Sequence, residues 1–154
     1  MNRTLDPISL GPLAVDRPVV LAPMCGVTDR PFRDLVADFG AGMVISEMIA
    51  STGVVAATRL SRERTHLAGS RGPRVIQLAG CDPAAMAEAA RLCEDLGADI
   101  IDINMGCPVK KVVSGYAGSA LMRDLGVAAR IIEATVQATR LPVTSPAMTT
   151  RRLC

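Results

Sequence analysis

Residues 102–111 read DINMGCPVKK and directly follow the apolar run at 98–101. The pattern predicts a buried strand that ends in a loop, with Cys107 just beyond the C-terminal end of the strand. In a parallel α/β barrel, that edge is where chemistry is done. The glycine and proline beside the cysteine shape its turn, because glycine relaxes the backbone and proline fixes it. Asn104 adds an amide that donates and accepts hydrogen bonds, which suits a planar amide or imide ligand.

The organisation of the whole chain decides between a functional cysteine and a plain buried loop cysteine. Short apolar runs alternate with helical patterns along the sequence. Strands are expected at 18–22, 43–46, 74–78, 98–103 and 141–144, and helices at 29–40, 52–61, 82–97 and 127–136. Asp29 and Asp82 each precede a proline at a helix start, which is typical of N-caps.

This alternation of strands and helices demands a parallel sheet with right-handed crossovers. Either an open doubly wound sheet or a (β/α)8 barrel satisfies that demand. No G-x-G-x-x-G sequence follows any of the expected strands, so the dinucleotide-binding sheet lacks its fingerprint. The sequence therefore predicts an α/β fold of the (β/α)8, or TIM-barrel, type. A complete barrel typically needs about 250 residues, so the 154 residues here are expected to form about the first four βα units.

Composition sets the class of protein. Hydrophobic residues make up 49% of the chain and charged residues 21%, which is typical of a globular domain rather than a disordered one. Aromatic residues make up only 2%, so the expected core is aliphatic and a base-stacking platform of the RRM or OB type is disfavoured. The net charge of +2 is too small to indicate nucleic-acid binding by itself.

Cysteine usage argues against both disulfides and zinc. The chain has five cysteines: Cys25, Cys81, Cys93, Cys107 and Cys154. Their number is odd and no C-x-x-C occurs, so neither a disulfide framework nor a zinc site is expected. His66 is the single histidine, so no histidine-based metal site is expected either. Reduced thiols favour a cytoplasmic protein, and no signal peptide or membrane span is expected.

Several separate motifs occur in one order along the chain. They are APMCGVTDRPF at 22–32, SEM at 46–48, VIQLAG at 75–80, the stretch at 102–111 and AGSAL at 117–121. Together they resemble the tRNA-dihydrouridine synthases, and their order and spacing resemble the bacterial B-type branch of that family. The resemblance extends over about residues 10–144.

The resemblance implies a fold and an activity. Members of this family have an FMN-binding (β/α)8 barrel followed by a smaller helical domain that binds tRNA. They reduce the C5–C6 double bond of uridines in tRNA, and NADPH reloads the flavin. By this resemblance Pro23, Met24 and Cys25 line the isoalloxazine ring, with Cys25 in contact through its backbone. Gln77 hydrogen-bonds the flavin.

The resemblance also implies a substrate side to the site. Asn104 holds the uracil edge and Cys107 supplies a proton. An ordinary thiol has a pKa near ~8.5 and is still protonated at neutral pH, so it can act as an acid. Lys110 and Lys111 favour the thiolate if they lie close, and we expect them to point toward tRNA phosphate or simply into solvent. Glu47, at a strand end, is expected to orient other groups.

The chain departs from the family pattern at its end. Residues 1–144 are expected to be the N-terminal half of a flavin barrel, and 145–154 a divergent tail with Pro146 where a flavin-contacting lysine is expected. The second half-barrel and the tRNA-binding domain are expected to be absent. The alternative is therefore an inactive fragment, at most a weak flavin-binding module or one that self-associates through open sheet edges. Another pyrimidine-reducing flavin barrel, such as a dihydroorotate dehydrogenase, is less favoured.

Overall fold

The computed structural model of the chain describes residues 6–59, 65 and 72–145. The strands are β1 (Ile8–Leu10), β2 (Leu13–Val15), β3 (Val20–Leu21), β4 (Met43–Ile45), β5 (Ile49–Ala50), β6 (Arg74–Ala79), β7 (Ile100–Ile103) and β8 (Val143–Thr144). The helices are α1 (Arg30–Asp38), α2 (Ser51–Val55), α4 (Pro83–Asp95), α5 (Lys110–Val113) and α6 (Leu125–Ala138), with a 3-10 helix, η1 (Gly118–Arg123).

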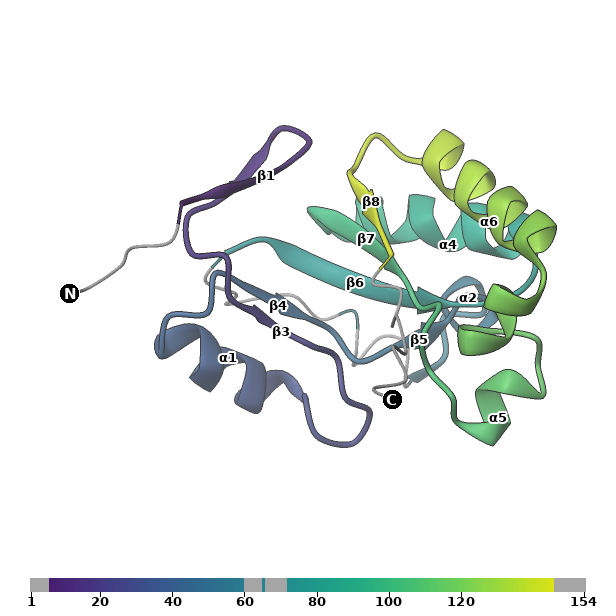
Figure 1. Cartoon of the computed structure of the whole chain (residues 1–154), viewed down its shortest axis with the longest axis horizontal. Coiled ribbons are helices and arrows are strands. Elements are labelled where there is room, and N and C mark those ends of the chain that lie inside the picture. The colour runs from purple at the N-terminus through teal and green to yellow at the C-terminus, as the bar shows by residue number, and fades with distance from the viewer. Residues whose placement is uncertain (1–5, 60–64, 66–71, 146–154) are drawn as a thin grey trace, which may run out of the picture.

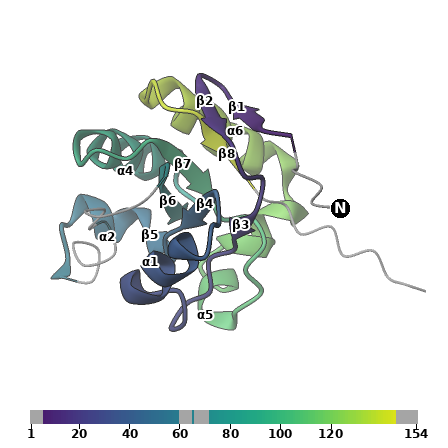
Figure 2. The same cartoon turned by 90° about the vertical axis from the view of Figure 1, so that its left-hand side faces the viewer.

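One parallel sheet organises these elements. Its strand order is β3-β4-β6-β7-β8, and the short β5 also pairs with β6. Each of the expected strands is present, so the predicted parallel α/β fold is confirmed. The sheet is an open arc from β3 to β8, with α1, α4 and α6 following the strands around its outside (Figures 1 and 2). It is the arc of a partial barrel.

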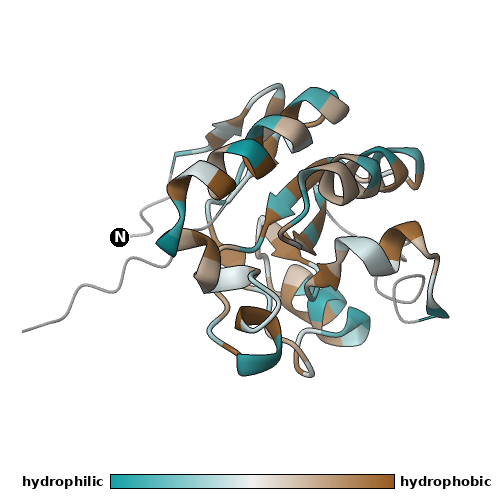
Figure 3. Cartoon of the chain, turned by 90° about the vertical axis from the view of Figure 1, so that its right-hand side faces the viewer, coloured by the Kyte–Doolittle hydropathy of each residue, from teal (hydrophilic) through white to brown (hydrophobic). Residues whose placement is uncertain are grey.

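The core between sheet and helices is aliphatic, as composition predicts. Ile76, Leu78, Ile101 and Ile103 of β6 and β7 are fully buried and pack with Met86 and its neighbours on α4. Since alternate strand residues point to opposite faces, the residues between them point to the inside of the arc. Hydrophobic and hydrophilic segments alternate along the helices outside the sheet (Figure 3). The expected caps are confirmed, because Asp29 accepts a hydrogen bond from Phe32 N and Asp82 one from Ala84 N, each at 3.0 Å.

A short antiparallel hairpin, β1–β2, covers the N-terminal ends of the strands. It was not predicted, because two strands of three residues carry too little periodicity. Val15 is 1% exposed and packs against residues at the strand starts, which are Met43, Ile45, Val75 and Ile100, with Leu10 and Leu13 beside them. The hairpin thus closes this end of the arc with apolar side chains.

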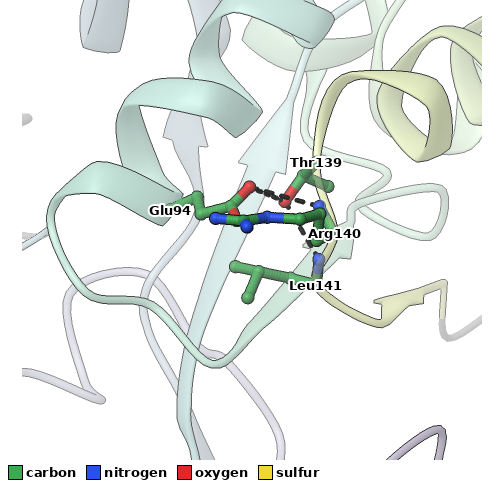
Figure 4. Close-up of polar contacts among 4 residues, drawn as sticks. All are labelled: Glu94, Thr139, Arg140 and Leu141. Carbon is green, nitrogen blue, oxygen red and sulfur yellow. Dashed lines mark hydrogen bonds and ion pairs between the residues drawn. The ribbon is translucent and has the colours of Figure 1, made fainter.

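Polar contacts fix the turns at the same end. Glu94, at the end of α4, accepts hydrogen bonds from Thr139 Oγ1 at 2.6 Å and from Arg140 N at 3.2 Å (Figure 4). Thr139 Oγ1 in turn accepts from Leu141 N at 3.1 Å, which sets the turn into β8. The hydroxyl of Thr139, more than any other partner, lowers the pKa of Glu94.

Some sequence-based expectations differ from the structure or fall outside it. The helix expected at 52–61 is interrupted, since α2 ends at Val55 and a turn follows; residues 60 and 61 lie outside the described residues. The loop after β7 contains α5 and η1, neither of which was predicted. His66 and residues 146–154 of the divergent tail, with Pro146 and Cys154 among them, lie outside the described residues, whereas Ser145 is described and its Oγ donates to Ile103 O at 3.1 Å.

Candidate active site at the C-terminal ends of the strands

A cleft of about 360 Å³ lies at the C-terminal ends of the parallel strands. Five of the predicted site residues line it: Pro23, Cys25, Gln77, Asn104 and Cys107. The other lining residues, which were not singled out as site residues, are Ala22, Met48, Gly106, Pro108 and Val109. Loops that follow β3, β4 and β7 therefore meet the end of β6 around one space, at the edge where barrel enzymes carry their sites.

The loop after β3 is held by buried polar groups. Thr28 is fully buried, and its hydroxyl accepts a hydrogen bond from Met24 N at 2.9 Å. Arg33 is 7% exposed and donates to Thr28 O at 2.8 Å. Desolvation lowers the pKa of Arg33. The backbone of residues 23–25 therefore has a fixed path past the cleft.

Glu47 links this loop to the end of β4 through a hydrogen bond. Its Oε1 accepts a hydrogen bond from Gly26 N at 2.6 Å. Gly26 has φ +79°, in the left-handed region that glycine adopts most readily. The structure confirms that Glu47 orients another group, and it identifies that group as the loop that carries Cys25.

Two amides and a carboxyl form a chain of hydrogen bonds across the inside of the arc. Asn104 Nδ2 donates to Gln77 Oε1 at 2.8 Å, and Gln77 Nε2 donates to Asp102 Oδ2 at 2.7 Å. Thr144 Oγ1 donates to Asp102 Oδ1 at 2.6 Å. Gln77 N also donates to Ser46 Oγ at 3.0 Å. The chain joins β6, β7 and β8 just beneath the cleft.

Asn104 also shapes the loop that carries Cys107. Its Oδ1 accepts hydrogen bonds from Cys107 N at 3.0 Å and Gly106 N at 3.3 Å. Cys107 O accepts from Ser119 N at 3.0 Å, so the loop is fixed on its other side too. Cys107 is half-buried and faces the cleft.

Asp102 is the polar residue at the site whose role sequence reasoning missed. It is fully buried, and burial raises the pKa of its carboxyl, while the hydrogen bonds from Thr144 and Gln77 act in the opposite direction. A carboxyl inside the apolar run IIDI of β7 was the available signal, because buried carboxyls need partners.

The remaining predicted residues lie outside the lining of the cleft. Met24 is 43% exposed and does not line it. Lys110 and Lys111 are exposed at the start of α5, directly after the lining residue Val109 (Figure 1). They therefore lie beside the cleft rather than in it.

Within residues 6–59, 65 and 72–145, no three His, Cys, Asp or Glu side chains are grouped so that they could hold a metal ion. No helix in those same ranges is both long and apolar enough to cross a membrane.

An open arc of parallel strands with a cleft at their C-terminal ends defines a partial α/β barrel. Residues 20–151 match the family model described as Dihydrouridine synthase (Dus), and the chain belongs to this family. This family is the one that the motifs resemble, so the resemblance is confirmed.

Named relatives agree with this assignment. The chain is 58% identical over 132 residues to a probable tRNA-dihydrouridine synthase of Rhizobium leguminosarum bv. phaseoli, covering 86% of this chain and 41% of the relative. It is 52% identical over 138 residues to that of Rickettsia bellii (strain RML369-C), covering 89% of this chain and 42% of the relative. It is also 52% identical over 137 residues to tRNA-dihydrouridine synthase B of Pseudomonas aeruginosa, covering 89% and 41%. The chain therefore spans about two fifths of the length of these relatives.

A solved structure supports the fold. The structure of histamine dehydrogenase from Rhizobium sp. 4-9 superposes with a TM-score of 0.61 over 92% of this chain and 33% of that chain. The sequences are 13% identical, so the likeness concerns the fold alone.

Proposed function

We propose that a protein containing this sequence acts as a tRNA-dihydrouridine synthase, which reduces the C5–C6 double bond of uridines in tRNA with NADPH through FMN. The observation that supports this most is the single cleft lined by Cys107, Asn104, Gln77 and the loop after β3. Family membership and the names of the relatives point the same way. Reduced thiols suit a cytoplasmic enzyme.

The cleft suits one side of a flavin ring. Ligand pockets have volumes of roughly 300–1,000 Å³ and apolar linings with few polar groups, and this cleft has about 360 Å³ with Ala22, Pro23 and Val109 in its lining. Gln77 is only 2% exposed yet reaches the lining, where its amide can hydrogen-bond a ring edge. In this proposal Pro23, Cys25 and Gln77 hold the isoalloxazine. Met24, outside the lining, is proposed from the resemblance alone.

The proposed reaction adds one hydride and one proton across a carbon–carbon double bond. Reduced FMN, when bound, would supply the hydride, and NADPH would return the oxidised flavin to its reduced form. Cys107 supplies the proton to the neighbouring carbon, because its thiol faces the cleft and carries a transferable hydrogen. The thiolate left behind regains its proton from solvent before the next turnover.

Asn104 and the two lysines form the proposed substrate side. The Asn104 amide lies between Gln77 and the Cys107 loop, so a uracil held by it is close to the thiol. Lys110 and Lys111 stand at the rim, where their ammonium groups are proposed to bind tRNA phosphate. Displacement of counterions by such contacts makes tRNA affinity salt-dependent.

One variant tests the proton donor. Purified protein containing this sequence is given FMN, NADPH and unmodified tRNA, and dihydrouridine is measured by mass spectrometry. We expect Cys107→Ala to lower dihydrouridine formation by roughly 10²–10⁴-fold, the usual contribution of a general acid, while flavin reduction by NADPH stays near normal. Cys81→Ala, at an exposed cysteine outside the cleft, is the matched control. Unimpaired dihydrouridine formation in Cys107→Ala would refute the assignment.

A second variant separates the substrate side from the cofactor side. We expect Asn104→Ala to slow tRNA reduction by at least roughly tenfold without loss of bound flavin. The variant loses about one uncharged hydrogen bond to the substrate, and it also loosens the Cys107 loop. Flavin content is read from the visible spectrum. Loss of flavin with unchanged reduction per remaining flavin would contradict this role.

The same preparation distinguishes the alternative, a module that binds flavin weakly or self-associates. The described sheet ends at β3 and β8 without a strand beyond either. Open edges favour pairing between copies. If the protein is instead such a module, sedimentation should show concentration-dependent assembly, and tRNA should stay unmodified in the presence of FMN and NADPH.

A further inference from the structure

The hydrogen-bond chain inside the arc has a fixed direction. The backbone N–H groups of Gly106 and Cys107 can only donate, so they hold the oxygen of the Asn104 amide. The nitrogen of that amide must then face Gln77 Oε1, and Gln77 Nε2 must face the next acceptor. That acceptor is Asp102 Oδ2, at 2.7 Å.

Asp102 is the accepting end of the chain. It is fully buried, and its other oxygen accepts from Thr144 Oγ1 at 2.6 Å. A flipped Gln77 would set its oxygen against the carboxyl oxygen and its nitrogen against the Asn104 nitrogen. Both contacts are unfavourable in a dry interior, so the carboxyl and the loop amides together permit one orientation.

This orientation decides which atoms remain for a ligand. One Gln77 N–H is used by Asp102, and among the described residues no acceptor takes the other, although Gln77 is 2% exposed and lines the cleft. The oxygen of Asn104 is occupied by two backbone N–H groups. Its nitrogen lies 3.6 Å from Met48 Sδ, a weak acceptor that a better one can replace. Apart from one lone pair left on Gln77 Oε1, the free hydrogen-bonding capacity of this edge is therefore donor capacity.

We propose that Asp102 is a positioning residue that fixes Gln77 and Asn104 as donors, so that this edge of the cleft takes planar heterocycles presenting carbonyl oxygens or unprotonated ring nitrogens. Asp102 touches no ligand and acts through Gln77. The proposal deepens the proposed function and rests on it for the choice of a pyrimidine probe.

Protection of cysteines from alkylation tests the proposal without turnover. The chain is treated with iodoacetamide in the presence of uridine or cytidine, which share a shape but carry a carbonyl and an amino group, respectively, at the same ring carbon. Labelling of Cys107 is followed by peptide mass spectrometry. Exposed Cys81 serves as the reference, and buried Cys93 reports unfolding.

The expected result is a preference for uridine. The concentration of uridine that protects half of Cys107 should be roughly tenfold lower than that of cytidine. Tenfold is the effect expected when one hydrogen bond is matched in the first complex and unmatched in the second. Asp102→Asn should keep the preference, because an amide oxygen still accepts from Gln77 while its nitrogen donates to Thr144. Asp102→Leu should lose it while Cys93 stays protected. A merely structural role for Asp102 would not separate these two variants by nucleoside.

A further variant keeps the test decisive if Asp102→Leu exposes Cys93. The double variant Gln77→Glu/Asp102→Asn preserves the chain of bonds but replaces the free N–H of residue 77 by oxygen lone pairs, while the Asn104 nitrogen still donates. Its preference for uridine should therefore fall. Equal or absent protection by the two nucleosides in the unaltered chain overturns the proposal, as does a uridine preference retained by folded Asp102→Leu or undiminished in the double variant. FMN, NADPH and tRNA are not used here, so this proposal and the proposed function fail separately.

Discussion

The two ends of the strands are buried to the same degree but by different means. At the N-terminal end, Val15 and Ile100 are 1% and 0% exposed and pack in one apolar cluster. Toward the C-terminal end, Gln77 and Asp102 are 2% and 0% exposed and meet through hydrogen bonds. Burial therefore does not distinguish a core from a site in this fold.

The kind of group that is buried does distinguish them. An apolar end contributes hydrophobic free energy and has no orientation to preserve. A polar end costs desolvation and keeps its partners in one orientation, and this end borders the cleft. The comparison predicts that variants at the N-terminal end change stability alone, whereas variants at the C-terminal end change the geometry around Cys107.

The largest expected effect is at the N-terminal end. Ile100→Ala removes a fully buried side chain from the cluster around Val15, so the free energy of unfolding should fall by about 2–5 kcal/mol. Urea unfolding followed by circular dichroism measures it. In the fraction that remains folded, alkylation of Cys107 should keep its normal rate relative to Cys81. A changed ratio would show that the two ends are coupled.

A medium effect is expected where the Cys107 loop meets η1. Gly118 has φ +62°, and a Cβ there would lie 2.6 Å from Cys107 O and 2.9 Å from Val112 Cγ1. Gly118→Ala should therefore displace the Cys107 loop, with a conformational cost of about 1–2 kcal/mol for the left-handed backbone. Alkylation of Cys107 should change severalfold while buried Cys93 stays protected.

A nearby glycine serves as the control for this variant. Gly115 has no positive φ, and a Cβ there would meet Val112 O at an ordinary 3.5 Å. Gly115→Ala should leave the alkylation of Cys107 unchanged. If both variants alter it equally, the close approach at Gly118 is not what holds the loop.

The sequence predicted the parts of the molecule that depend on local pattern. Strands β6 and β7 follow from the predominantly apolar stretches at 74–78 and 98–103, and the caps Asp29 and Asp82 from short-range spacing. The positions of Asn104 and Cys107 at a strand end also follow from the run before them. The motif therefore located the cleft.

The parts that sequence could not predict depend on tertiary pairing. Gln77 meets Asp102 across 25 residues, and Thr144 meets Asp102 across 42. No local pattern encodes contacts across such separations in sequence, so the orientation of the two amides was not predicted. For the same reason Asn104 was expected to offer a free acceptor, whereas its oxygen accepts from the Cys107 loop. The hairpin β1–β2 was missed because its packing against Ile100, not its own pattern, makes it stable.

The smallest expected effect concerns a polar contact at the N-terminal end, where the comparison predicts no influence on the cleft. Asp99 accepts hydrogen bonds from Arg74 Nε and Arg74 N, each at 2.8 Å, and from Arg74 Nη2 at 2.9 Å. The side-chain hydrogen bonds from Arg74 are the main reason that the pKa of Asp99 lies below its ordinary value. Arg74 is 40% exposed, so water screens the pair and its contribution to stability is no more than about 1 kcal/mol.

A carboxyl with a depressed native pKa stabilises the fold above its unfolded pKa, near ~4, and loses that contribution as the pH falls through the native pKa. Asp99→Asn should therefore be less stable than the unaltered chain at pH 7, and the difference should shrink as the pH is lowered below ~4, measured by urea unfolding across the series. Labelling of Cys107 at pH 7 should be identical in the two proteins. A stability difference that grows on acidification would contradict the assigned sign, and altered Cys107 labelling would show that even this remote polar contact reaches the cleft.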